Sequence, residues 1–379
     1  MWRVLLVLAL VSCKENESKL NAPPPPKAAP GDAAVAQKDL ATQLEEIRAK
    51  LGLPALAAAA WRDGKLVEMA SVGVRKAGDP TKVTDADEWH LGSNTKAMTA
   101  LLVGIYVDRG ALHWDDTLGK LFAGDKLDPA YASVTLDQVL RHQSGTPAEP
   151  PAALWKQLWD DGEKLDDTVA RAKFVKATLA APPKQKAGEF AYSNANYMIA
   201  GAALEKVTGK RWQDLIKSEL FAKLDMKSCG FGAPGTKTLV DQPRGHDAGG
   251  TPIEPGPAAD NPPGLGPAGT VHCSLGDYGK FLNVFATGQP ALVSPATMQH
   301  LTTASAQMGY AGGWMVVTNA RGKLLVHSGS NTMWYATAMV APDEHIAFVV
   351  ATNKGDQALE GSLGDLFGRY ATPKKKLVR

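Results

Sequence analysis

The sequence predicts an α+β fold in which one antiparallel sheet, flanked by helices, is built from both ends of the chain and carries an inserted, mainly helical subdomain. Strand-like runs occur near the start, from residue 55 to 74, and near the end, from residue 313 to 352. Between them, residues from about 112 to 231 show helical patterns with long connections. Runs of strands separated from runs of helices are typical of α+β proteins.

Composition and charge indicate a folded protein without a nucleic-acid partner. Of the 379 residues, 44% are hydrophobic, which is enough for a full core. The 41 basic and 39 acidic residues are scattered and give a net charge of +2, so no basic surface that would bind nucleic acid is expected. We expect residues 39–379 to form the folded domain, and the sequence leaves its oligomeric state open.

The first residues are predicted to target the chain and not to fold with it. Arg3 gives a short basic start, and residues 4–11 are apolar but too few to span a bilayer. Residues 1–12 resemble a bacterial lipoprotein signal peptide, and Cys13 would become the lipidated first residue of an exported protein. Such a protein is held on the periplasmic or cell-surface side of a membrane by its lipid anchor alone. The alternative, a plain secretory signal with an incidental cysteine, also exports the chain.

Residues 13–38 are predicted to be a tether. They contain Pro23-Pro24-Pro25-Pro26 and almost no large apolar side chains, so they stay extended and bury no core. Beyond Cys13, only Cys229 and Cys273 remain, an even pair for an oxidising compartment. A disulfide between them is one possibility, because sequence alone does not place their Cα atoms within bonding distance.

The N-terminal part of the domain is predicted to contain a helix, a hairpin and a second helix. Residues 39–51 repeat leucine and isoleucine at helical spacing, and residues 55–61 and 66–74 flank an Asp-Gly turn. A short extended piece at 88–91 leads to residues 97–107, which are apolar all round. A helix of that kind must be covered by other elements on most sides.

The remaining elements follow from periodicity and from helix breakers. Helices are predicted at residues 136–141, 152–159, 167–180, 196–208, 212–220 and 356–370. Strands are predicted at residues 313–318, 323–327, 335–341 and 346–352, the first two forming a hairpin. Residues 241–267 are rich in breakers, and a loop of this length is usually either functional or disordered.

Three groups of residues are candidates for chemistry. Ser93 and Lys96 share the first turn of the apolar helix, which brings a hydroxyl near an amine whose pKa burial would lower. Taken alone, the pair is equally compatible with a helix cap and a surface charge. Tyr192 and Asn194 combine a phenol that can relay a proton with an amide that can fix a lysine or a substrate carbonyl.

The third group is His327-Ser328-Gly329-Ser330, at the end of a predicted strand that would line a cleft beside Ser93. Gly329 would let a substrate lie along the backbone, and the Ser330 N–H would donate to an oxyanion. A second histidine, His142, follows a helix and precedes a proline, so we interpret it as part of a structural turn.

In the order Ser-x-x-Lys, Tyr-x-Asn, His-x-Gly, the chain resembles the serine β-lactamase-like, penicillin-binding family, in the branch of class C β-lactamases, DD-peptidases and β-lactamase-related esterases. The likeness runs from about residue 40 to 367. The matching segments are 91–96, 110–112 with 115–116, 140–145, 190–194, 207–209, 224–226, 268–270 with Asp277, and 352–353.

The resemblance implies that Ser93 attacks a carbonyl and forms an acyl-enzyme, with Lys96 and Tyr192 sharing the general-base and acid roles. Asn194 would orient Lys96 or the substrate amide. The backbone N–H groups of Ser93 and Ser330 would form the oxyanion hole. The substrate would be a small ester or amide or a cell-wall peptide, and the resemblance implies no metal or cofactor.

Two departures from the family pattern bear on the substrate. His327 stands at the position where class C β-lactamases, which this chain resembles, have lysine. A fixed positive charge that would bind a substrate carboxylate is therefore missing. Residues 331–334 are bulkier than the family's Gly or Pro-Gly. We therefore expect an esterase or D-amino-acid peptidase more than an efficient β-lactamase. The alternatives are a lipoprotein that binds cell-wall peptide or penicillin without hydrolysis, and a purely structural lipoprotein.

Overall fold

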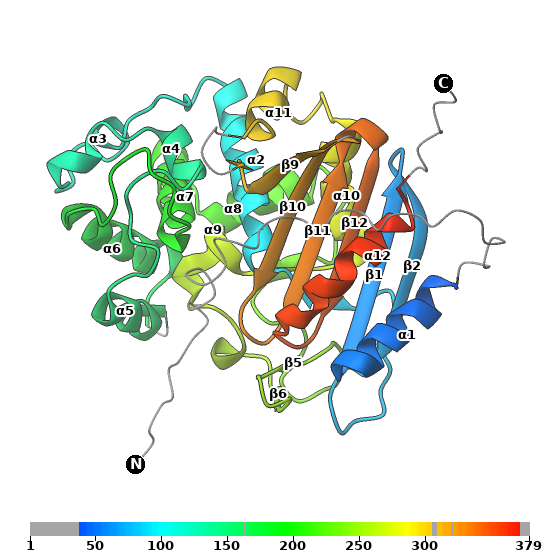
Figure 1. Ribbon diagram of the computed structural model, residues 1–379. Helices are drawn as coiled ribbons and strands as arrows, with labels where there is room; N and C mark the ends of the chain where they lie inside the picture. Colours follow the sequence, from blue (N-terminus) through cyan, green and yellow to red (C-terminus); the bar gives the residue numbers. More distant parts are fainter. Residues whose placement is uncertain (1–37, 163, 305–308, 320, 372–379) are drawn as a thin grey trace, which may run out of the picture.

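A seven-stranded antiparallel sheet forms the centre of the molecule, as the computed structural model of residues 38–162, 164–304, 309–319 and 321–371 shows (Figure 1). Its strand order is β2-β1-β12-β11-β10-β9-β8. The strands are β1 (Ala55–Arg62), β2 (Lys65–Gly73), β8 (Tyr310–Ala311), β9 (Trp314–Asn319), β10 (Gly322–Ser330), β11 (Tyr335–Ala341) and β12 (Ile346–Thr352). Because β1 pairs with β12, the two ends of the chain share one sheet, which confirms the predicted fold class.

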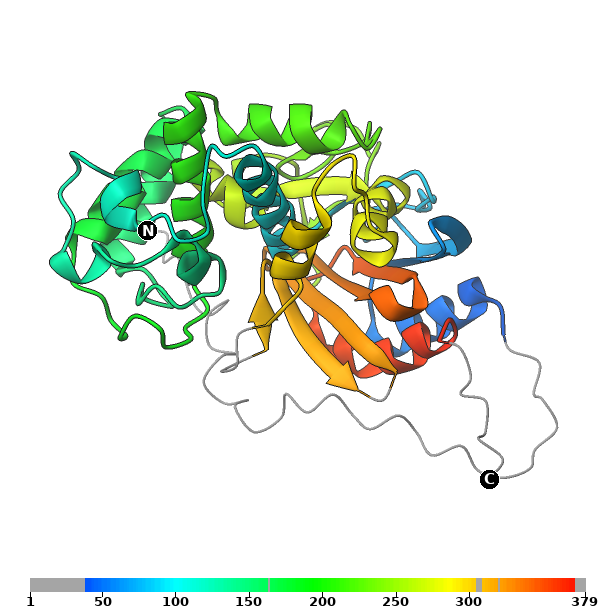
Figure 2. The ribbon, with the colours of Figure 1, turned by 90° about the horizontal axis from the view of Figure 1, so that it is seen from above.

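The two faces of the sheet belong to different hydrophobic clusters. Along β1, Leu56, Ala58 and Ala60 pack in a cluster with helices α1 (Leu40–Leu51) and α12 (Leu363–Gly368). The alternate residues face a larger cluster that includes α2 (Thr95–Asp108) and α10 (Leu275–Thr287). This alternation follows from the two-residue period of a strand. The sheet is therefore covered by helices on both faces (Figure 2).

The predicted helical insertion lies to one side of the sheet in Figure 1. Its helices are α3 (Leu118–Leu121), α4 (Leu136–Leu140), α5 (Ala152–Gly162), α6 (Asp167–Ala180), α7 (Asn194–Thr208) and α8 (Trp212–Ile216). After α8 the chain continues as one π-helical segment, Lys217–Phe221, so the predicted helix at 212–220 is regular only in its first half.

Other differences from the predicted elements have local causes. Helix α10 escaped prediction because Gly276 and Gly279 lower the helix propensity of its first half. The predicted C-terminal helix is a 3₁₀ segment, Gln357–Ser362, followed by the short α12, in a stretch that contains Gly361 and Gly364. The breaker-rich segment contains two short strands, β5 (Gly245–His246) and β6 (Pro252–Ile253), short 3₁₀ turns, and the start of α9 (Gly266–Gly269). Helix α11 (Pro295–Leu301) was also not predicted.

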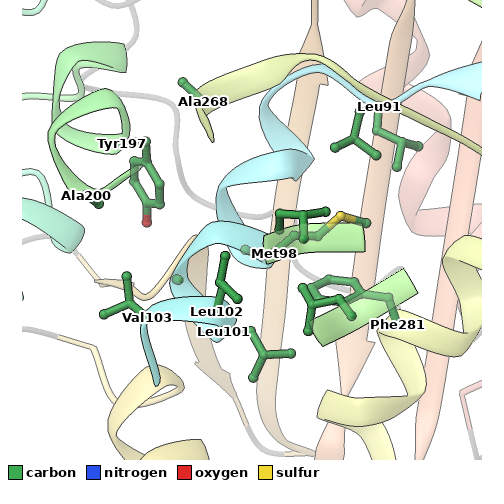
Figure 3. Close-up of a cluster of buried hydrophobic side chains, with 14 of the residues drawn as sticks. Leu91, Met98, Leu101, Leu102, Val103, Tyr197, Ala200, Ala268 and Phe281 are labelled. Carbon is green, nitrogen blue, oxygen red and sulfur yellow. The ribbon is translucent and has the colours of Figure 1, made fainter. Parts of the chain in front are cut away.

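Helix α2 lies between the insertion and the sheet, as its all-round apolar sequence predicts. Its residues from Thr95 to Tyr106 are all buried. Figure 3 shows Tyr197 and Ala200 of α7 on one side of the helix and Phe281 of α10 on the other. A polar side chain at the start of α2 is therefore enclosed by protein.

A disulfide joins Cys229 to Cys273, which settles the pairing that the sequence left open. Cys273 belongs to β7 (Val271–Ser274), the middle strand of a small sheet with β3 (Glu88–His90) and β4 (Gly230–Phe231). Because β3 leads directly into the turn that carries Ser93, the disulfide supports that turn through one strand pairing.

Gly279 of α10 packs against the ring of Trp61, and we expect Gly279→Ala to destabilise the protein. An added Cβ would lie 2.0 Å from the buried indole, and overpacking of this kind costs about 1–3 kcal/mol. A distance of 2.0 Å to a buried ring puts the cost toward the upper end of that range, above the gain in helix propensity of about 1 kcal/mol. The control is Gly276→Ala on the same helix, whose Cβ would meet no atom closer than 3.8 Å. Equal denaturant midpoints for the two variants would contradict the packing described here.

Candidate active site

Ser93 lies in a tight turn between β3 and α2. The turn is a 3₁₀ segment, Gly92–Asn94, and Gly92 adopts a φ of 52°, in the left-handed region. A Cβ at Gly92 would lie 2.4 Å from the backbone nitrogen of Ser330, so this position has no room for a side chain. The turn is therefore pressed against the end of β10, with Ser93 partly exposed at its tip.

Lys96 is fully buried one helical turn after Ser93, and its Nζ lies 2.9 Å from the Ser93 Oγ. Two further oxygens contact the amine, Asn194 Oδ1 at 2.7 Å and the carbonyl of Ala268 at 2.8 Å. Burial holds the pKa of Lys96 well below its usual value. A neutral amine has two N–H donors for the two oxygens and one lone pair left for the Ser93 hydroxyl proton. The geometry therefore suits general-base activation of Ser93.

Tyr192, just before α7, and Asn194, at its start, both lie near the same amine. The Lys96 Nζ lies 5.0 Å from the centre of the Tyr192 ring, and Asn194 is the first residue of the helix. The preceding backbone is held by His142, whose Nδ1 accepts the Ser193 N–H at 3.2 Å. The structure thus brings the first two predicted groups together around one nitrogen.

His142 occupies a structural turn, as predicted from its position. It has a φ of 58°, is buried, and its ring lies 4.3 Å from the Tyr192 ring. Its Nδ1 also faces the Asn196 side-chain amide at 3.1 Å. His142 therefore holds the Tyr192 segment from behind.

His327 lies on β10 and is also near Tyr192, with 6.3 Å between the ring centres. Its Nε2 is 3.3 Å from the hydroxyl of Tyr310. Burial, assisted by the nearby Lys96, lowers the pKa of His327 to about 3. The imidazole is therefore neutral near pH 7 and supplies no fixed positive charge.

The other residues of the third group have separate positions. Ser328 is next to His327 on the strand and points to the opposite face, where its hydroxyl lies 2.9 Å from that of Thr337. The Ser330 hydroxyl donates to the carbonyl of Trp334 at 2.6 Å. Both hydroxyl groups are thus engaged outside the cluster around Lys96.

The backbone of the third group is in direct contact with the nucleophile turn. A Cβ at Gly329 would lie 2.2 Å from the carbonyl oxygen of Leu91 and 2.5 Å from the nitrogen of Ser93. Together with the contact between Gly92 and Ser330, this puts the backbone nitrogens of Ser93 and Ser330 on two touching segments. That placement is compatible with a shared oxyanion hole.

Sequence reasoning missed the carbonyl of Ala268 as a partner of Lys96, and it missed Tyr310 beside His327. A backbone carbonyl carries no signal of residue type, and Tyr310 belongs to a two-residue strand too short to predict. Within the described ranges, no cluster of three or more His, Cys, Asp or Glu side chains is arranged to hold a metal ion. In the same part of the chain, none of the helices has the length and apolar character needed to cross a bilayer.

Comparison with known proteins identifies the family of the chain. A family model described as Beta-lactamase matches residues 40–367. The chain belongs to the beta-lactamase family. It is 26% identical over 338 residues to "Penicillin-binding protein 4" of Amycolatopsis lactamdurans. The alignment covers 83% of this chain and 84% of that protein.

Two solved structures are similar in fold. The octameric penicillin-binding protein homologue from Pyrococcus abyssi superposes with a TM-score of 0.68 at 24% sequence identity. The superposition covers 86% of this chain and 76% of the homologue's chain. A D-stereospecific amidohydrolase from Streptomyces sp. superposes with a TM-score of 0.69 at 22% sequence identity. That superposition covers 86% of this chain and 98% of the amidohydrolase chain. At these identities the likeness shows the fold alone. Family membership and the Ser93–Lys96 pair support a serine-hydrolase type of activity.

We expect covalent labelling of Ser93 by a fluorophosphonate to reach its full rate well below pH 10.5. Its rate should rise as Lys96 loses its proton, and burial lowers the pKa at which this happens. Lys96→Met should slow labelling by about 10²–10⁴-fold, the usual contribution of a general base. The measurement is the second-order labelling rate between pH 4 and 11. A rate that still rises steeply up to the ordinary pKa of lysine would contradict a neutral Lys96.

Proposed function

We propose that the protein is an exported, lipid-anchored serine hydrolase that forms an acyl-enzyme at Ser93 and hydrolyses an ester or an amide. The observation that carries the proposal is the environment of Lys96, whose buried Nζ lies within hydrogen-bond distance of two carbonyl oxygens, which would accept both N–H groups of the neutral amine. The lone pair is then directed to the Ser93 hydroxyl, 2.9 Å away. Attack by the Ser93 oxygen on a carbonyl would transfer the hydroxyl proton to Lys96. The backbone N–H groups of Ser93 and Ser330 would stabilise the oxyanion.

The return of the proton to the leaving group completes acylation. Lys96 and Tyr192 are the groups proposed to share this step, and the centre of the Tyr192 ring lies 5.0 Å from the Lys96 amine. A water molecule activated by the same groups would then hydrolyse the acyl-enzyme and release Ser93.

The substrate proposed is an ester or D-amino-acid amide without a carboxylate that must be paired. His327 is neutral near pH 7, so the third motif offers hydrogen bonding and no cation. Resistance-grade β-lactam hydrolysis is therefore less favoured than esterase or peptidase activity. The similarity to a penicillin-binding protein and to the fold of a D-stereospecific amidohydrolase is in keeping with this substrate class.

We expect a fluorescent phosphonate or penicillin to modify Ser93 of the full chain in detergent. The adduct is located by peptide mass spectrometry, and a panel of p-nitrophenyl esters, D-Ala-D-Ala peptides and a chromogenic cephalosporin measures turnover. Ser93→Ala should lose both labelling and turnover. Ser71→Ala on the outer strand β2 is the control and should keep both, because the Ser71 hydroxyl bonds only to the surface Asp85 in the contacts described. Absence of an adduct at Ser93 with every acylating probe would rule out the catalytic proposal.

A second candidate function is a binding lipoprotein that acylates without turnover. It is favoured by the rigid segment after the third motif, where Thr332 has a φ of 75° and the Asn331 side chain accepts the backbone N–H groups of Met333 and Trp334. A segment fixed in this way can restrict the entry of water. Stoichiometric labelling without turnover of any substrate in the panel would support this second function.

Export and anchoring rest on the sequence of residues 1–38, of which residues 1–37 lie outside the described residues. We expect Cys13→Ser to abolish incorporation of radiolabelled palmitate in the native host and to move the protein from the membrane to the soluble fraction. Palmitate labelling should require an intact Cys13, and mass spectrometry of the N-terminal peptide checks cleavage after residue 12. Unchanged membrane association of the Cys13→Ser protein would argue for a plain secretory signal or another anchor.

A further inference from the structure

A buried histidine outside the catalytic group holds the nucleophile turn. The His90 side chain is completely buried at the end of β3, and its Nδ1 accepts the N–H of Gly92 at 3.1 Å. Because a backbone N–H can only donate, Nδ1 is unprotonated and the ring proton is on Nε2. That nitrogen lies 2.6 Å from the carboxylate of Asp260. Asp260 thus fixes the tautomer and orientation of the ring that holds the residue before Ser93.

The neighbours of Asp260 contact two other parts of the site. On one side, the carbonyl of Ala259 accepts the side-chain N–H of Asn331, the residue that follows Ser330. On the other side, Asn261 donates to the carbonyl of Gly269 at 2.7 Å. Gly269 directly follows Ala268, whose carbonyl contacts Lys96. Three consecutive residues therefore hold three separate backbone segments around the Ser93–Lys96 pair.

The segment is suited to hold a fixed geometry. Ala259 is fully buried and Asp260 is 9% exposed, so both are packed within the protein. Pro257 precedes the three residues, and Pro262 and Pro263 follow them, which fixes φ at both ends and restricts the residues before each proline. The segment lies in the breaker-rich stretch 241–267, whose length already indicated a functional or disordered loop.

We propose that Ala259-Asp260-Asn261 is a positioning clamp for the acyl-transfer site. Asp260 acts through His90 on the nucleophile turn, Asn261 acts through Gly269 on the carbonyl that binds Lys96, and Ala259 acts through Asn331 on the end of β10. The clamp makes no contact with the reacting atoms in this scheme, and its contribution is to keep the nucleophile, its base and the oxyanion donors in register. This inference rests on the proposed acyl transfer at Ser93.

The test measures fluorophosphonate labelling of the full chain in detergent, separating the maximal labelling rate from the apparent affinity. Asp260→Ala and Asn261→Ala should each lower the maximal rate about tenfold to a hundredfold with little change in affinity, because small misplacement of reacting groups slows chemistry. Asp260→Asn keeps an acceptor for the His90 Nε2–H and should recover most of the lost rate. Asp247→Ala, which removes a cap from the Thr251 N–H in a surface turn of the same stretch, is the control.

Thermal unfolding separates positioning from loss of fold. A fall in the maximal rate of folded protein, with recovery in Asp260→Asn, supports the clamp. Wild-type rates in both alanine variants, or equal losses in Asp260→Ala and Asp260→Asn, would overturn it. If Asp260→Ala does not fold, Asn261→Ala decides by the same rate measurement. Failure of wild-type protein to label at Ser93 would instead defeat the proposed function, so the two failures are distinguishable.

Discussion

The burial of one amine, Lys96, is the constraint on which the rest of the structure depends. An ionisable group removed from water is tolerated only where fixed polar atoms replace its hydration. Here the three oxygens come from the nucleophile turn, from Asn194, 98 residues away in sequence, and from Ala268, 172 residues away. Helix α2, the insertion and the segment before β7 must therefore meet at one nitrogen. The helical insertion is accordingly part of the site and not an appendage to the sheet.

The second requirement is close contact between backbones, which only glycine permits at the two points concerned. Where the nucleophile turn meets β10, Gly92 lies against the backbone of Ser330, and Gly329 lies against the backbone of Ser93. Side chains at either position would separate the nitrogens of Ser93 and Ser330. The end of β10 is held in the sheet by β11, which pairs with it as far as Ser330, whereas β9 pairs only with Gly322 to Val326. Rigid placement of oxyanion donors is valuable because it avoids reorganisation during the reaction.

The parts predicted from sequence are those with a local signal. The all-round apolar pattern of α2, the Asp-Gly hairpin and the order of the three motifs gave the fold class and the residues gathered around Ser93. Helix α10 was missed because its glycines lower its helix propensity. One of them, Gly279, is needed for packing, since the ring of Trp61 leaves no room for a side chain there. Ala268 and Asp260 were missed for a different reason. Their roles depend on where the folded chain places a carbonyl and a carboxylate, and no spacing in the sequence encodes that placement.

The replacement of lysine by histidine in the third motif is consistent with the electrostatics of this enclosed site. Burial lowers the pKa values of Lys96, His142 and His327, and a positive charge at Lys96 lowers those of both histidines further. A second lysine at the place of His327 would add a buried cation beside Lys96 and favour the loss of a proton from one of them. With histidine, the cluster would stay free of a competing charge during the proposed transfer of the Ser93 proton to Lys96. The same neutrality leaves the third motif without a cation that would attract an anionic substrate. The proposed base role of Lys96 and the proposed preference for uncharged substrates would then both follow from the burial of this cluster.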